Sequence, residues 1–133
     1  MSILSTNCRG LGGDAAVREL RILVARHSPS VLCVVETQLH KTRLEGLSRS
    51  LGFNKSFAVS SSGRSGGLGL FWNYHEIKIE ILPYSQYHLD TVVSEEGKDP
   101  WRLTIVYGEA QLEGRGREER GNRPWGEIGR AHV

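Results

Sequence analysis

The feature that most constrains the fold is the five-residue run Val-Leu-Cys-Val-Val at residues 31–35. A run this apolar and β-branched is typical of a strand buried on both faces. A short apolar-rich run occupies residues 1–6, and the apolar residues between the two runs recur at helical spacing, with Asp14 as the expected helix cap and Pro29 as the stop. Residues 3–35 therefore predict a β-α-β unit whose two strands are parallel.

The rest of the ordered sequence predicts one more helix and then a succession of strands. The second helix is expected at residues 41–51, closed by Gly52. Apolar runs and alternating patterns predict further strands at residues 53–59, 68–72, 77–83, 88–94 and 101–107. The expected fold class is therefore α/β (α+β), with a β-α-β-α start followed by strands in hairpin-like succession.

Length, charge and cysteine content limit the classes of protein that fit. A chain of 133 residues suits one domain, and a formal charge of +2 is too small to argue for nucleic acid by itself. Cys8 and Cys33 both lie in apolar context, which favours reduced thiols over a disulfide. We see no signal peptide and no apolar run near the ~20 residues that span a bilayer, so we expect a soluble, intracellular protein without a membrane partner.

The segment at residues 111–133 differs in kind from what precedes it. It is rich in glycine and charge and has no apolar period, so it lacks the means to offset the entropy of ordering. Its last residues, "IGRAHV", also resemble the translation of a sequencing adapter. We therefore interpret residues 111–133 as a disordered or artefactual tail.

The candidate site lies where the two strands of the β-α-β unit end. The first strand ends at Asn7 and the second at Glu36. Parallel neighbours bring their carboxyl ends to one edge of the sheet, where ligands bind in such folds. An amide oxygen and a carboxylate then meet beside the glycine-rich turn "RGLGG", which is a reasonable start for a site that holds a hard cation through oxygen ligands.

Plainer interpretations of the same residues remain open. Asn7 is also typical of a turn former that bonds its own backbone, and Glu36 of the first solvated residue after a buried strand. Cys8 and Cys33 fit small core residues better than nucleophiles. The loop around Arg64 is either a flexible hairpin loop or a phosphate cradle. "GLGG" is a poor match to a dinucleotide fingerprint, so a nucleotide-binding module is a minor alternative.

Four segments in order carry a resemblance to a known family. They are "ILSTNCRGLG", "PSVLCVVETQL", "LGF" followed by "GRSGGLGLFW", and "WRLTIVYGE". Together they resemble the first half of the endonuclease/exonuclease/phosphatase superfamily domain, and more narrowly the AP-endonuclease-like domain of plant LINE-type (non-LTR) retrotransposons. The resemblance covers about residues 1–109. It implies an N-terminal half-domain over residues 1–110, as a partial four-layer, two-sheet sandwich of mixed strands flanked by helices.

The resemblance also implies an activity and the residues that carry it. The family cleaves phosphodiesters with Mg²⁺, and in these retrotransposons the domain is taken to nick DNA for a reverse transcriptase domain in the same polyprotein, which implies a nuclear location. Asn7 matches the Asn that helps hold metal and phosphate, and Glu36 matches the metal-binding Glu. Tyr107 matches the Tyr that hydrogen-bonds the phosphate.

The departures from the family pattern bear on activity. Thr6 stands where the family usually has Trp, and Ala110 where it has Pro. The sequence contains no "GDFN"-like motif to hold the nucleophilic water and no "SDH"-like pair to act as base. His132 lies in the suspect tail, and His88 has Asp90 beside it but within a strand. We therefore expect an inactive fragment of a Mg²⁺-dependent DNA endonuclease domain. The alternative is a non-catalytic, weak nucleic-acid-binding fragment or pseudogene product.

Overall fold

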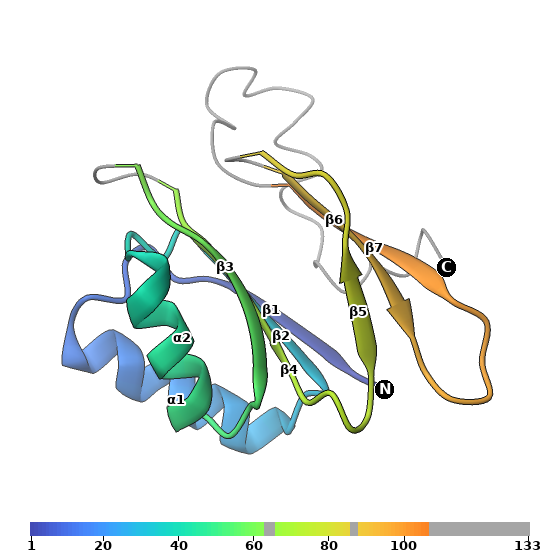
Figure 1. The fold of residues 1–133 in the computed structure, drawn as a ribbon. Coiled ribbons are helices and arrows are strands. Elements are labelled where there is room, and N and C mark those ends of the chain that lie inside the picture. Colours follow the sequence, from blue (N-terminus) through green and yellow to red (C-terminus); the bar gives the residue numbers. More distant parts are fainter. Residues whose placement is uncertain (63–65, 86–87, 107–133) are drawn as a thin grey trace, which may run out of the picture. The chain divides into compact units, whose positions relative to one another are not determined.

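The structure, a computed structural model, describes residues 1–62, 66–85 and 88–106 (Figure 1). The chain divides into two compact units, residues 1–74 and residues 75–133. The first unit contains a four-stranded mixed sheet and two helices, and the described part of the second contains a three-stranded antiparallel sheet. The predicted α/β class with two sheets is confirmed.

The four-stranded sheet has the order β1-β2-β4-β3. Its strands are β1 (Ile3–Asn7), β2 (Val31–Val35), β3 (Lys55–Val59) and β4 (Leu68–Trp72). β1 and β2 pair in parallel, as the β-α-β interpretation predicted, while β4 is antiparallel to both β2 and β3. All five residues of β2 and of β4 are buried, whereas β1 and β3 are only partly buried. The most apolar strands therefore occupy the centre of the sheet.

Both helices pack against one face of this sheet (Figure 1). They are α1 (Asp14–His27) and α2 (Lys41–Ser50). A single apolar cluster joins them to the central strands, and its buried members are Leu11, Leu20, Leu32, Val34, Leu39, Leu44, Phe53 and Phe71. The guanidinium of Arg21 on α1 donates to the carbonyl and hydroxyl oxygens of Ser50, at 3.1 and 3.2 Å, and so links the two helices.

The N-terminal cap of α1 differs from the sequence prediction. The residue that caps α1 is Gly13, and no side chain bonds the amides of the first turn, so the prediction that Asp14 is the cap was wrong. Asp14 is instead the first helical residue, where its negative charge interacts favourably with the positive end of the helix dipole. For α2, the Nδ1 atom of His40 accepts a hydrogen bond from the amide of Thr42, at 3.2 Å.

The three-stranded sheet has the order β5-β6-β7 and is antiparallel throughout. Its strands are β5 (Lys78–Ile81), β6 (His88–Ser94) and β7 (Trp101–Val106). Burial alternates along β6, so that one face is buried and the other partly exposed. Thr91 is a polar residue on the buried face, and its hydroxyl donates to the carbonyl oxygen of Leu103 at 3.0 Å. A buried hydroxyl is thereby satisfied.

Several sequence predictions agree with the structure at the level of individual residues. The strands at 31–35, 68–72 and 88–94 have the predicted bounds, and the others differ by one or two residues at an end. Cys8 and Cys33 are free cysteines, as predicted. Within the described residues, no helix is both long and apolar enough to cross a membrane. The predicted tail at 111–133, with Trp125, lies outside the described residues.

Candidate functional site

The site is built on the parallel pairing of β1 with β2. In this pairing Asn7, the last residue of β1, lies opposite Val35, the last residue of β2. The amide of Cys8 then donates to the carbonyl oxygen of Val35 at 2.9 Å, which brings the chain after β1 alongside Glu36. The structure therefore places Asn7 and Glu36 at neighbouring strand ends, where the sequence expected them. Their roles stay a prediction.

The pairing continues past both strands into the turns. The amide of Gly10 donates to the carbonyl oxygen of Glu36 at 2.8 Å, and the amide of Leu11 donates to that of Thr37 at 2.9 Å. The glycine-rich turn after β1 is thus bonded along its length to the segment that carries Glu36. Gly10 has a φ of 103°, a conformation that costs glycine little and other residues more.

The side chain of Asn7 takes part in a local turn. Its Oδ1 atom accepts a hydrogen bond from the amide of Arg9 at 3.1 Å, and the residue is exposed. This is the self-bonding turn that the plainer interpretation of Asn7 predicted. An amide oxygen has two lone pairs, so the bond to Arg9 leaves Oδ1 with a second one for a ligand. The turn fixes where that lone pair lies.

Strained backbone gathers around these two residues. Arg9, Glu36 and Gln38 have φ values of 49°, 54° and 56°, in the left-handed region that non-glycine residues rarely adopt. Among the described residues only one other non-glycine residue, Ser28 at the end of α1, has a positive φ. Such strain costs on the order of 1 kcal/mol or more per residue and tends to cluster at functional sites. Its concentration here is the strongest structural sign of a site.

Two glycines before β4 support the Glu36 segment. The amide of Gln38 donates to the carbonyl oxygen of Gly66 at 3.0 Å, and that of Thr37 to Gly67 at 3.4 Å. Thr37 is fully buried, and its Oγ1 atom accepts from the amide of Leu39 at 3.3 Å. The sequence analysis did not single out Thr37, Gln38 or Gly67. The paired glycines in "RSGGLGL" were the signal that a close backbone approach was needed there.

The thiol of Cys8 reports on the electrostatics of the site. Burial, and after it the nearby negative charge of Glu36, raises the pKa of Cys8 from 9.0 to about 12. Burial also raises the pKa of Cys33. Both thiols therefore stay protonated at neutral pH, which fits their interpretation as core residues and not nucleophiles. The effect of Glu36 on Cys8 also shows that its carboxylate lies close to the turn after β1.

The donor set present fits part of a magnesium site. Glu36 offers a carboxylate and Asn7 an amide oxygen, and Mg²⁺ commonly takes one or two protein carboxylates while keeping several waters. Within residues 1–62, 66–85 and 88–106 no three His, Cys, Asp or Glu side chains form a group that could hold a metal ion. The two candidate oxygen donors at this edge, Asn7 and Glu36, therefore stay a prediction.

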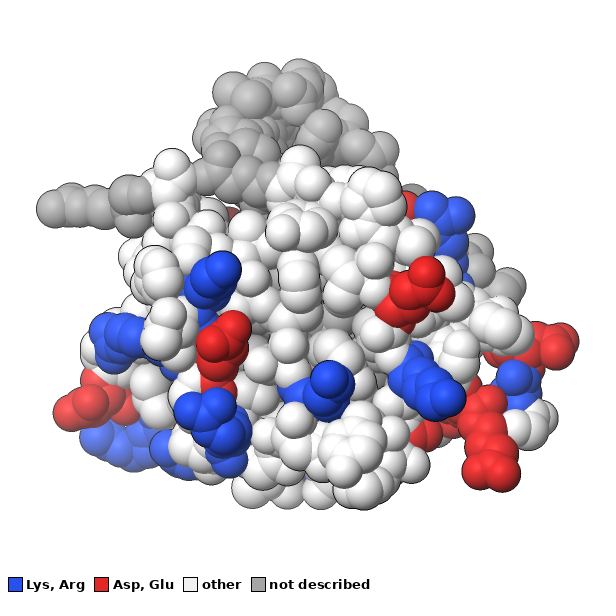
Figure 2. Space-filling model, in the orientation of Figure 1, with Lys and Arg blue, Asp and Glu red and all other residues white. Residues whose placement is uncertain are grey.

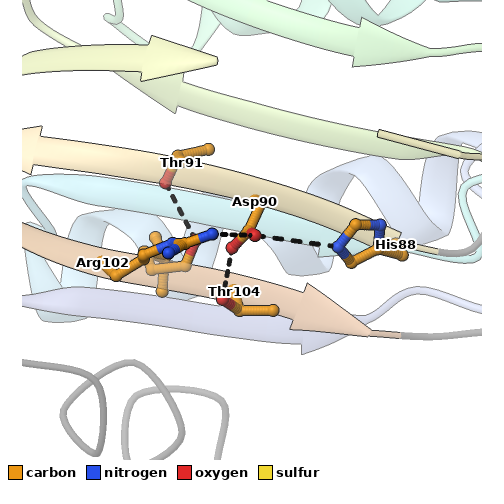
Figure 3. Close-up of polar contacts among 6 residues, drawn as sticks. His88, Asp90, Thr91, Arg102 and Thr104 are labelled. Carbon is orange, nitrogen blue, oxygen red and sulfur yellow. Dashed lines mark hydrogen bonds and ion pairs between the residues drawn. The ribbon is translucent and has the colours of Figure 1, made fainter. Parts of the chain in front are cut away.

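A second polar cluster lies on the three-stranded sheet, at the His88–Asp90 pair noted in the sequence (Figure 3). Asp90 accepts hydrogen bonds from Arg102 Nη2, at 2.6 Å, and from the hydroxyl of Thr104. His88 Nε2 lies 4.0 Å from the same carboxylate. Because Asp90 already bonds two residues of the neighbouring strand, this cluster ties β6 to β7 and does not resemble a free acid-base pair.

Four residues considered in the sequence analysis lie outside the described residues. They are Tyr107, the predicted phosphate contact, Arg64 between β3 and β4, Ala110, and His132 in the predicted tail. In the sequence, Tyr107 directly follows the last residue of β7.

Comparison with known proteins bears on the fold. No protein-family model matches the chain, and no curated protein matches it. A humanized D. rerio TDP2 with 14 mutations matches with a TM-score of 0.57 and 18% identity, over 91% of this chain and 57% of that one. The AP endonuclease LMAP from Leishmania major matches with a TM-score of 0.56 and 18% identity, over 87% of this chain and 44% of that one.

A third solved structure is D. rerio TDP2 complexed with a single-strand DNA product. It matches with a TM-score of 0.57 and 19% identity, over 91% of this chain and 52% of that one. The chain thus spans about half of each of these structures. At identities this low, the likeness establishes the fold. The chain has the fold of part of TDP2 and of part of an AP endonuclease, in agreement with the superfamily that the sequence motifs resemble.

Proposed function

We propose that this chain is part of a Mg²⁺-dependent phosphodiesterase domain that nicks DNA, of the kind found in LINE-type retrotransposons. Asn7 and Glu36 hold the metal ion, and Asn7 and Tyr107 contact the phosphate. The observation that carries the proposal is the pairing of two strand ends, Asn7 opposite Val35, which brings an amide and a carboxylate to one edge of the sheet. The strained backbone at Arg9, Glu36 and Gln38 supports the same edge.

The metal would supply the positive charge that phosphodiester cleavage needs. A bound Mg²⁺ stabilises the negative charge that develops on the phosphoryl oxygens. Asn7 and Glu36 would hold it, and the Asn7 amide group would help to orient the phosphate. The local turn holds the side chain of Asn7, and the left-handed backbone of Glu36 sets the direction in which its side chain leaves the main chain, which would reduce the ordering cost of binding.

Two observations support DNA as the partner: the charge of residues 1–74, and the structural similarity to D. rerio TDP2 complexed with a single-strand DNA product. Residues 1–74 contain nine lysines and arginines against four aspartates and glutamates, so this unit is more basic than the chain as a whole. A basic unit attracts the phosphate backbone of nucleic acids. On the face drawn in Figure 2, Lys and Arg are interspersed with Asp and Glu. The positive charge in that view is therefore spread out, which favours weak binding without sequence preference.

We propose that the chain is inactive by itself. It spans about half of the matched nuclease structures, and its sequence has no motif like the family's Asp-x-Asn or Asp-His pairs. A nuclease needs a positioned water and a base as well as the metal, and the loss of one member of such a unit costs several orders of magnitude. In the alternative function, the chain is a non-catalytic, weak nucleic-acid-binding fragment or the product of a pseudogene.

The wider assignments follow from the sequence resemblance. We propose that residues 1–110 belong to the N-terminal half of an endonuclease/exonuclease/phosphatase domain, while residues 111–133 lie outside the described residues. The parent polyprotein carries a reverse transcriptase domain and acts in the nucleus. The genomic sequence downstream of the codon for Ala110 discriminates between an enzyme and an inactive fragment, because an open frame that continues to the Asp-x-Asn and Asp-His motifs would restore the enzyme.

A titration with Mn²⁺, monitored by amide NMR signals, tests the metal site directly. Mn²⁺ broadens the signals of nearby amides even when it binds weakly. We expect selective broadening at residues 7–10 and 36–38, and its loss in Glu36→Gln. Glu45→Gln is the matched control, because Glu45 is an exposed carboxylate on α2 of the same unit. Broadening elsewhere, or broadening that survives Glu36→Gln, would contradict the metal site.

A further inference from the structure

We propose that Gly67, through its contact with Thr37, is a positioning residue that holds Glu36 in its left-handed conformation. This inference rests on the proposed function for its purpose, since Glu36 is the proposed metal ligand. Gly67 immediately precedes β4, and Thr37 immediately follows Glu36. The two segments are far apart in sequence and meet only in the folded chain.

The contact leaves no room for a side chain at Gly67. A Cβ atom built there would overlap the Oγ1 atom of Thr37 and would lie 3.1 Å from the backbone nitrogen of Gln38. Thr37 has little freedom to move away, because it is fully buried and its Oγ1 atom accepts from the amide of Leu39. Both partners of the contact are therefore fixed, and the threonine side chain is the nearest neighbour of the position that an added Cβ atom would take, with the Cβ atom of Ser61 at 3.4 Å.

Hydrogen bonds hold residues 36–38 from both sides. The amide of Gln38 donates to the carbonyl oxygen of Gly66 at 3.0 Å, and on the opposite side the amide of Gly10 donates to the carbonyl oxygen of Glu36 at 2.8 Å. Residues 36–38 are thus held between the turn after β1 and the glycines before β4. Glu36 and Gln38 both have left-handed φ values, which cost free energy and persist only where the surroundings impose them.

The backbone conformation of Glu36 affects the direction of its side chain. A residue with positive φ points its side chain differently from one in the β region, so the conformation of Glu36 decides where its carboxylate lies. If residues 36–38 relaxed into extended backbone, the carboxylate would leave the edge that it shares with Asn7. Gly67 therefore acts on the proposed metal site without touching the metal.

The test compares substitutions that differ in the contact alone. Gly67→Ala places a methyl group against Thr37 at a φ of 98°. Gly52→Ala is the matched control, because Gly52 has a φ of 97° and nothing within 4 Å of an added Cβ atom. The same backbone strain is then present in both variants, and only one has the overlap. Thr37→Ala and the double variant Thr37→Ala/Gly67→Ala complete a double-mutant cycle.

The readout is the intraresidue HN–Hα nuclear Overhauser effect at Glu36, which is strong when φ is positive. We expect the strong signal in the wild type and in Gly52→Ala, and its loss in Gly67→Ala. Thr37→Ala should weaken it by removing the filling side chain, and the double variant should regain it because the new methyl group fills that space. If Gly67→Ala does not fold, the comparison of Thr37→Ala with the double variant still tests the proposal, because only the double variant should regain the strong Glu36 signal.

Three results would overturn the proposal. They are a wild-type signal retained in Gly67→Ala, equal losses in Gly67→Ala and Gly52→Ala, and no recovery in the double variant. Because the readout uses no metal, its outcome is separate from that of the Mn²⁺ titration. If Mn²⁺ broadens the expected signals but the Glu36 signal does not depend on Gly67, the proposed function stands and Gly67 has no part in it. If the Glu36 signal depends on Gly67 but Mn²⁺ causes no selective broadening, the positioning contact stands and the metal site does not.

Discussion

The amide of Gly10 donates a hydrogen bond to the carbonyl oxygen of Glu36, and the two atoms lie 2.8 Å apart. This bond extends the parallel pairing of β1 and β2 beyond the last residue of either strand. The turn after β1 and the segment that carries Glu36 are consequently one hydrogen-bonded structure. Substitutions in the turn should therefore affect the geometry at Glu36.

Gly10→Ala should destabilise the protein, because Gly10 has a φ of 103° and an added Cβ atom would lie 3.0 Å from Oε1 of Gln38. Left-handed backbone costs a non-glycine residue about 1–2 kcal/mol. Urea unfolding measures the loss. Gly12→Ala is the control, since Gly12 has open space for a Cβ atom and no positive φ. Equal effects of the two substitutions would mean that the turn does not need glycine at position 10.

Cys8 should react very slowly with alkylating reagents in the folded protein. Its pKa is about 12, against 9.0 for a free thiol, so its thiolate fraction near pH 8 is about a thousandfold smaller. Mass spectrometry after timed iodoacetamide treatment measures the rate. Glu36→Gln should speed the reaction, because the negative charge of Glu36 is the second cause of the raised pKa, after burial.

The control for this experiment is Glu45→Gln, which should leave the Cys8 rate unchanged. A rate that does not respond to Glu36→Gln would place the Glu36 carboxylate away from the turn.

The raised pKa of Cys8 also has a consequence for stability. A folded pKa raised above the unfolded value contributes stability that is fully present below pH 9 and is lost as the pH rises toward 12. Cys8→Ala should remove that alkaline loss.

Asp90→Asn should weaken the three-stranded sheet. Asp90 accepts from Arg102 and Thr104 on β7, and its side chain is only 16% exposed. We expect a loss of about 1 kcal/mol in the free energy of unfolding, because Arg102 is itself largely exposed and screened by water. Glu95→Gln is the control, since the Glu95–Lys98 pair is longer, at 3.9 Å, and local in sequence.

The contribution of Asp90 should also depend on pH. Partial burial raises its pKa, but hydrogen bonds from Thr104 and Arg102 and the charges of Arg102 and His88 outweigh that effect, so the pKa lies below 3.8. A lowered pKa contributes stability that is present above the unfolded value and is lost as the pH falls through the folded value. The stability difference between wild type and Asp90→Asn should therefore shrink below pH 3.8. A difference that is constant down to pH 2 would contradict this assignment.

The purified chain should not nick supercoiled plasmid DNA in the presence of Mg²⁺. It offers two oxygen ligands at the proposed site and contains no motif for the positioned water or the base. Agarose gel electrophoresis of the plasmid forms measures nicking, and Glu36→Ala controls for contaminating nuclease. Nicking by the wild-type chain that disappears in Glu36→Ala would show a competent enzyme and would refute the proposed inactivity.

The sequence determined the elements and the central strand pairing of this protein. Five consecutive apolar residues at Val31–Val35 have no polar face to leave in water, so the strand they form must be covered on both sides. The short helical connection between two strands then requires a parallel, right-handed crossover. That argument places the residue after Val35 beside Asn7 without any knowledge of the remaining chain, and the local turn at Asn7 follows from the chemistry of a single amide.

Only the tertiary structure revealed the position of β4 between β2 and β3, and with it the support of the Glu36 segment. A strand's place in a sheet depends on burial summed over all its neighbours, which sequence order does not contain. Thr37 and Gly67 are therefore an unremarkable threonine and a loop glycine in the sequence, and they become neighbours only when β4 pairs with β2. The left-handed backbone of Glu36 depends on these long-range contacts, because a local preference would favour extended or helical angles there.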